Sequence, residues 1–177
     1  MSGLFISMVN SILWVMFMKT LDYNRSKAAS YARKWAMGRN PDYYDFSEIG
    51  GDCTNFVSQC IYAGSGIMNY TPVSGWFYRS VNDRTASWTA VEYLCKFLID
   101  NQSVGPFGSE CQLFKIQQGD IIQLGNNDLG YYHSLFVLHK YPDIRVAAHS
   151  ADVYNQSLTA YNYDFLRCIH IDGVRAW

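Results

Sequence analysis

The residue of this chain best suited to chemistry is a cysteine. In the run GGDCTNFVSQC, residues 50–60, Cys53 follows two glycines and an aspartate and stands at the start of an apolar pattern with helical spacing. A helix N-terminus lowers the pKa of a thiol, and the thiolate is the nucleophilic form. The unpaired N–H groups of a first helical turn also suit an oxyanion. Cys53 is therefore a candidate nucleophile, and the competing interpretation is a small buried side chain without chemistry.

A cysteine nucleophile is activated by a base, and the chain has four histidines. His133 begins an apolar strand pattern beside a turn, where catalytic side chains are usually found. His139 follows about 20 Å further along the same strand, too far to serve one site. His170 lies within the strand-like segment LRCIHI and is interpreted as structural. We therefore expect His133 to be the base.

A third residue is expected to orient the base. A turn at Pro142 predicts that the segments on either side of it form an antiparallel hairpin. The far end of that hairpin, around His149 and Asp152, then lies opposite His133. Either side chain can hold the His133 ring by a hydrogen bond, which is the role of the third member of a triad. The sequence leaves His149 and Asp152 open.

The elements that must position these residues are helices in the first half of the chain and strands in the second. Amphipathic spacing predicts three helices, over residues 24–37, 54–63 and 87–100. We expect Asn24 or Ser26 to cap the first of them and Asp52 to cap the second. Strand periodicity predicts four strands, over 120–124, 133–139, 144–149 and 166–171. Helices followed by strands define the α+β class.

Between the second and third helices lies a long irregular segment, residues 67–86. Loops of this length in a compact domain are usually functional or disordered, and its aromatic residues argue against disorder. The aromatic part, Tyr70 to Tyr78, either lines a substrate groove or packs on itself.

Composition excludes several classes of function. The length of 177 residues fits one domain, and 49% apolar with 16% charged residues is typical of a folded protein. A net charge of −1 gives no reason to expect a nucleic-acid partner. The five cysteines are odd in number, without C-x-x-C or zinc spacing, so we expect no disulfide framework, no metal and no cofactor. This favours a reducing compartment such as the cytoplasm.

The N-terminal run GLFISMVNSILWVMFM, residues 3–18, stands apart from the domain. It is slightly short for a transmembrane helix and has no preceding basic residue, unlike a secretory signal. It is interpreted as a signal or membrane anchor, as a helix packed on the domain or on a second copy, or as sequence upstream of a true start at Met18. The last is favoured. We set residues 1–20 apart, place the catalytic domain at 21–177, and expect membrane association only through residues 3–18.

Four segments occur together in a recognisable order. The runs GGDCTNFVSQC, GDIIQL (119–124), YHSLFV (132–137) and AHSADVYNQSL (148–158) resemble the putative amidase domain family, which is similar to the NlpC/P60 superfamily of papain-like cysteine hydrolases. The resemblance extends from about Leu21 to Ile171. It implies a papain-like α+β fold, with N-terminal helices packed on an antiparallel sheet.

Carried over by position, the resemblance implies Cys53 as nucleophile, His133 as base and His149 as orienting residue, with Asp152 as the alternative. The implied reaction is hydrolysis of an amide or peptide bond in a peptide or small amide substrate, through an acyl-enzyme. A thiol acyltransferase and a non-catalytic ligand-binding module are the alternatives on the same fold. The local papain pattern around the nucleophile is absent, and no peptidoglycan-binding repeat accompanies the domain.

Overall fold

A computed structural model describes residues 18–177. The helices are α2 (Arg25–Trp35), α3 (Cys53–Ser65), α4 (Ala86–Thr89) and α5 (Val91–Asp100). The main-sheet strands are β1 (Lys19–Leu21), β4 (Gly105–Cys111), β5 (Ile121–Asn126), β6 (Gly130–His139), β7 (Arg145–Ala148), β8 (Val153–Ser157) and β9 (Phe165–Ala176). A small separate hairpin is formed by β2 (Tyr78–Ser80) and β3 (Asp83–Arg84).

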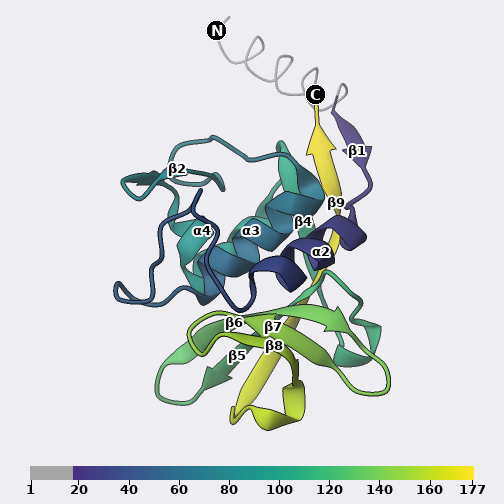
Figure 1. Cartoon of the computed structure of the whole chain (residues 1–177). Coiled ribbons are helices and arrows are strands. Elements are labelled where there is room, and N and C mark those ends of the chain that lie inside the picture. Colours follow the sequence, from purple (N-terminus) through teal and green to yellow (C-terminus); the bar gives the residue numbers. More distant parts are fainter. Residues whose placement is uncertain (1–17) are drawn as a thin grey trace, which may run out of the picture.

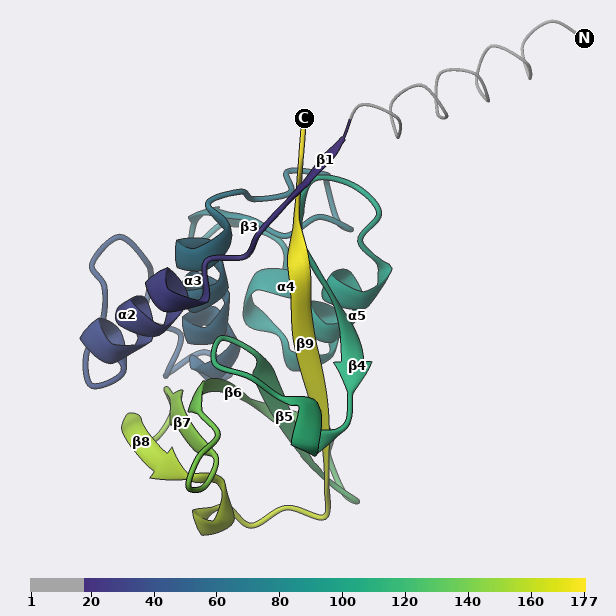
Figure 2. The same ribbon diagram turned by 90° about the vertical axis from the view of Figure 1, so that its right-hand side faces the viewer.

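The main sheet is antiparallel throughout. Its strands follow the order β1-β9-β5-β6-β7-β8, and β4 also pairs with β9. The long strand β9 runs past both the helices and the lower strands in Figure 1, and Figure 2 shows β4 lying along it on the side of α5. The α+β class predicted from the sequence is confirmed.

Two apolar clusters hold the domain together, one on each face of the central strands. Phe136 and Leu138 of β6 belong to the cluster that packs under the helices, whereas Leu135 and Val137 belong to the other. This is the alternation expected of a strand that is buried on both faces. It means that neighbouring residues of β6 face different environments, which decides the geometry of the site.

The predicted helices are largely present. Asn24 caps α2, because its side chain accepts a hydrogen bond from Lys27 N at 2.9 Å. The second helix begins at Cys53 and ends at Ser65, and the next residue, Gly66, adopts the left-handed conformation common after a helix C-terminus. The single helix predicted over 87–100 is wrong, since Ala90 is extended and divides it into α4 and α5.

The strand predictions are correct in place but incomplete. The hairpin around Pro142 forms, as β6 and β7 pair antiparallel. The sequence did not predict β1, β4 or β8. Strand β1 includes Lys19 and Thr20, so the sheet begins before residue 21, the predicted start of the domain. The segment 67–86 is not an open loop, since it contains the β2–β3 hairpin and the fully buried Trp76.

The alternatives for the run 3–18 concern positions outside the described residues, except for Met18. Within residues 18–177, no helix combines the length and apolar character needed to cross a membrane.

The close approach of β4 to β9 at Gly108 generates a stability prediction. A Cβ added at Gly108 would lie 2.3 Å from the backbone oxygen of His170, an atom that cannot move without disturbing the sheet. We expect Gly108→Ala to lower the free energy of unfolding by about 1–3 kcal/mol in a urea titration. Gly38→Ala is the control, because nothing lies within 4 Å of its added Cβ, and it should not be destabilised. Equal unfolding midpoints for the two variants would contradict this account.

Candidate active site

The chain turns sharply into helix α3 immediately before Cys53. Gly50 and Gly51 have φ values of +90° and +99°, which side-chain-bearing residues rarely adopt. The first helical hydrogen bond joins Phe56 N to Asp52 O at 3.0 Å. The backbone N–H groups of Cys53, Thr54 and Asn55 therefore lie outside the helical ladder, and that of Thr54 faces the Cys53 sulfur.

The thiol of Cys53 is buried against strand β6. Its side chain is 7% exposed, and Sγ lies 3.8 Å from Thr54 Oγ1, which in turn lies 3.0 Å from Ser134 Oγ. Burial raises the pKa of the Cys53 thiol, and the lowering by the N–H of Ser134 and by Thr54 does not compensate for it. Burial therefore opposes the lowering of the Cys53 thiol pKa that is expected from the helix N-terminus.

Cys53 lines a groove of about 450 Å³. The walls come from the loop before α3, from the α4–α5 segment and from the start of β6. The lining residues are Phe46, Ile49, Gly50, Gly51, Cys53, Thr54, Arg84, Thr89, Ala90, Val91, Glu92, Tyr93, Tyr131 and Tyr132. The aromatic part of the irregular segment, Tyr70 to Tyr78, is not among them. A substrate in this groove would lie against Cys53, between helices and sheet.

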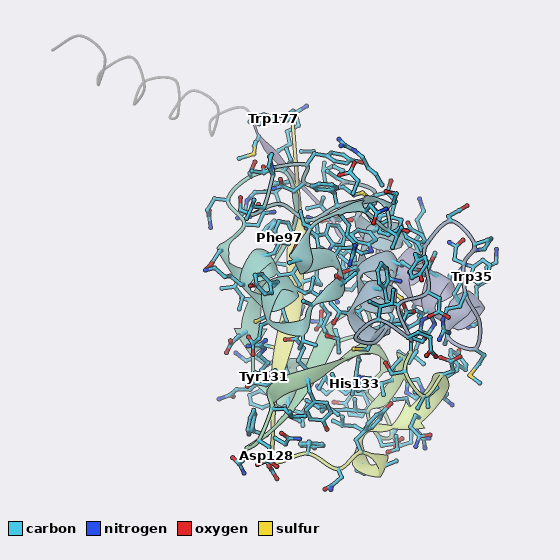
Figure 3. All side chains as sticks on the ribbon, turned by 90° about the vertical axis from the view of Figure 1, so that its left-hand side faces the viewer. Trp35, Phe97, Asp128, Tyr131, His133 and Trp177 are labelled. Atoms are coloured by element: carbon cyan, nitrogen blue, oxygen red, sulfur yellow. The ribbon has the colours of Figure 1, made fainter. Side chains whose placement is uncertain are left out.

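His133 precedes Ser134, the residue of β6 whose backbone contacts Cys53, and its side chain lies on the other face of β6. Its ring lies 6.0 Å from that of Tyr161 and 6.3 Å from that of Tyr132, and Figure 3 shows it near the boundary between the helices and the lower strands. Neither ring nitrogen forms a hydrogen bond within residues 18–177, and the Tyr161 hydroxyl is buried without a partner. Burial lowers the pKa of His133 to about 4, so its ring is neutral at pH 7. No hydrogen bond joins His133 to Cys53 in the described structure.

His149 is held by Asp52 and not by His133. Its Nδ1 lies 2.5 Å from Asp52 Oδ2, its Nε2 lies 2.9 Å from Trp35 O, and its ring stacks on Phe56 at 4.1 Å. Both nitrogens thus face acceptor oxygens, one on the Asp52 side chain and one on the Trp35 backbone. Asp52 and His149 are 0% and 1% exposed, so this is a fully buried pair.

Asp52 does not cap α3 with its side chain, contrary to expectation. Its Oδ1 accepts hydrogen bonds from Phe46 N at 2.9 Å and from Asn55 Nδ2 at 2.8 Å. The carboxylate thus joins the loop before α3, the first turn of α3 and the end of β7. The sequence signal for this role was the position of Asp52 directly before Cys53.

Asp152, the alternative third residue, is also engaged elsewhere. It accepts two hydrogen bonds from Arg39, at 2.9 and 3.0 Å. The same guanidinium lies 3.2 Å from Asp45 and 3.5 Å from Asp52 through its Nε. Sequence reasoning missed Arg39, which has no motif of its own. Asp152 therefore contributes to the charge cluster around Asp52 and does not contact His133 in this structure.

Metal-ligating side chains do not converge in the described part of the chain. Across residues 18–177, no group of three or more His, Cys, Asp or Glu side chains has the spacing of a metal site.

This α+β domain presents a cysteine at a helix N-terminus, in a groove lined also by residues of α4, α5 and β6. Residues 22–171 match the family model described as "Putative amidase domain", and the chain belongs to this family. The family description indicates a hydrolase.

One curated relative is similar over part of the chain. The "Uncharacterized protein YhbB" of Bacillus subtilis (strain 168) is 37% identical over 91 residues, which cover 50% of this chain and 28% of that protein. The chain thus spans well under two thirds of the length of this relative. No solved structure was found to match the chain.

The buried Asp52–His149 pair generates a second stability prediction. Asp52→Ala leaves the buried Nδ1 of His149 without its partner, and we expect a loss of about 3–5 kcal/mol in the free energy of unfolding. Asp152→Ala is the matched control, since it removes a carboxylate from a partly exposed ion pair, and its cost should be about 1 kcal/mol or less. Chemical denaturation at pH 7 measures both, and similar losses for the two variants would refute the special position of Asp52.

The buried neutral His133 generates a pH prediction. Its folded pKa of about 4 lies below the unfolded value of about 6.5, so the unfolded chain binds the extra proton between these values. This stabilisation is complete above pH 6.5 and is lost as the pH falls towards 4. Between pH 7.5 and 5, we expect His133 to account for a loss of about 2 kcal/mol, visible as the difference between wild type and His133→Leu.

Unfolding titrations at a series of pH values measure that difference. His139→Gln is the control, since it removes an exposed histidine from the far end of the same strand. A His133→Leu profile parallel to that of wild type would show that His133 is solvated in the folded protein.

Proposed function

We propose that this domain hydrolyses an amide or peptide bond through an acyl-enzyme on Cys53. The observation that carries the proposal is that Cys53 lines a groove at the N-terminus of α3, where backbone N–H groups lie outside the helical ladder. A carbonyl carbon next to the sulfur would place its oxygen near these N–H groups, which can stabilise the developing oxyanion. The membership of the family agrees with this reaction class.

His133 is the proposed base. A neutral imidazole can accept the Cys53 proton, and no hydrogen bond within the described residues holds the ring in its position beside Tyr161. Its neighbour Ser134 already contacts the first turn of α3 through Thr54. Because His133 lies on the other face of β6, side-chain rotation alone does not bring it to Cys53. We propose that strand β6 rearranges at the bulge beside His133 when a substrate occupies the groove, and that this turns the His133 ring toward Cys53. Proton transfer then accompanies attack, because burial favours the uncharged form of both groups.

The steps balance without a cofactor. The Cys53 proton passes to His133 while sulfur bonds to the carbonyl carbon. The carbon–nitrogen bond then breaks, and His133 returns the proton to the leaving amine. Water, deprotonated by His133, attacks the thioester and releases the acid and the Cys53 thiol.

His149 is proposed as a positioning residue. In a Cys-His-His triad it would hold His133, but here its two nitrogens bind Asp52 and Trp35. It acts through Asp52, which is the residue before the nucleophile, and so fixes the start of α3 against the sheet. Asp152 has a more distant share in the same arrangement, through Arg39.

The acyl-enzyme proposal is tested with a panel of peptide and small amide substrates and an activated ester. We expect Cys53→Ala to lower the rate by about a thousandfold or more, and His133→Ala by about a hundredfold or more. Cys111→Ala, at a partly exposed cysteine outside the groove, should keep the wild-type rate. Mass spectrometry should locate the trapped acyl group on Cys53.

The alternatives give different results in the same experiment. A thiol acyltransferase would form the acyl-enzyme but release it faster when an amine acceptor is added. A binding module would show neither an acyl adduct nor any loss on Cys53→Ala. Acylation of Cys111 alone would also refute the assigned nucleophile.

A further inference from the structure

We propose that Arg84 binds a carboxylate of the substrate, so that the groove takes acidic peptides or amides whose carboxylate lies close to the scissile bond. This inference rests on the proposed function, because it concerns the substrate of the same groove. It follows from the charges that line the groove and from the partners of each.

The guanidinium of Arg84 is incompletely satisfied. Nη1 donates a hydrogen bond to Val81 O, and Cζ lies 4.4 Å from the centre of the Phe46 ring. Nε is buried and has no hydrogen-bond partner. No ion pair within residues 18–177 involves Arg84. A buried donor without an acceptor is uncommon in folded proteins, and it is costly unless a ligand completes it.

The acidic residue that lines the groove with Arg84, and the acidic residue before Arg84 in the sequence, are both paired with other arginines. Glu92 lines the same groove, but its Oε2 accepts a hydrogen bond from Arg167 Nη2 at 2.9 Å. Asp83, the neighbour of Arg84 in β3, pairs with Arg79 at 3.2 Å. The positive charge of Arg84 is therefore not neutralised by the protein, whereas the negative charge of Glu92 is.

The position of Arg84 defines where the ligand charge would lie. Arg84 and Cys53 line one groove of about 450 Å³, together with Phe46, whose ring carries the guanidinium. Planar guanidinium groups bind carboxylates through paired hydrogen bonds, and stacking on an aromatic ring fixes the plane. A substrate with its reacting carbonyl at Cys53 would therefore lie in the same groove as Arg84.

A pair of alkylating reagents tests this without any substrate. Iodoacetate and iodoacetamide react with the same sulfur and differ in one carboxylate against one carboxamide. The rate of Cys53 alkylation by iodoacetate divided by the rate with iodoacetamide does not depend on the thiolate fraction. This ratio therefore reports only the preference for a negatively charged reagent. We expect this ratio to be roughly five- to tenfold higher in the folded protein than at the same cysteine in urea.

Matched arginine variants identify the source of the preference. Arg84→Gln should return the ratio to its value in urea, and Arg84→Lys should keep part of it. Arg79→Gln is the control, since it removes an arginine of the same hairpin that does not line the groove. An unchanged ratio in Arg84→Gln, or equal ratios in folded and unfolded wild type, would overturn the proposal.

A second measurement does not depend on Cys53, and so serves if the buried thiol is alkylated too slowly to give a rate ratio. Phenylglyoxal labelling of Arg84, mapped by mass spectrometry, should be suppressed by succinate but not by its neutral analogue succinamide. Equal labelling with both would overturn the proposal, and suppression by phosphate alone would show a phosphate site instead. Neither measurement requires hydrolysis, so a carboxylate preference in a protein without amidase activity would separate failure of the proposed function from failure of this inference.

Discussion

The structure around the site depends on one buried carboxylate. Asp52 binds the backbone of Phe46, the side chain of Asn55 and the ring of His149, and it is completely inaccessible to solvent. Removing a carboxylate from water costs several kcal/mol, and only full hydrogen bonding with an opposite charge nearby offsets this. Because the partners come from a loop, a helix and the end of β7, the carboxylate fixes where α3 starts. The place of Cys53 against β6 follows from it.

The same burial determines the resting chemistry. Burial raises the pKa of the Cys53 thiol and lowers the pKa of His133 to about 4, so burial favours the neutral form of both groups. A preformed thiolate–imidazolium pair would have to pay the desolvation of both charges in this environment. A neutral pair that exchanges its proton only during attack avoids that cost. In the proposed reaction, this burial would favour coupled proton transfer over a permanently ionised nucleophile.

The sequence predicted the elements better than their contacts. The glycines before Cys53 and the turn at Pro142 are local signals, and both give the predicted structure. The contact between Asp52 and His149 joins residues 97 positions apart, and no local pattern encodes it. Strand β8, with sequence VYNQS, and strand β4, with sequence GPFGSEC, lack the alternation that identifies strands. Their pairing with neighbouring strands decides their conformation.

Strand β6 shows why the site itself was harder to predict than the strand. Leu124 pairs with His133 but Gly125 with Tyr131, so one residue of β6 is extra at this point, and a bulge of this kind changes which side chains face α3. The residue that meets the helix is Ser134. Ser134 belongs to a chain of hydrogen bonds that runs from Thr54 through Ser134 and Gln123 to Arg167. Arg167 in turn binds Glu92. Glu92, the acidic residue that lines the groove, is thus paired with an arginine, and the other charged residue in that lining is Arg84.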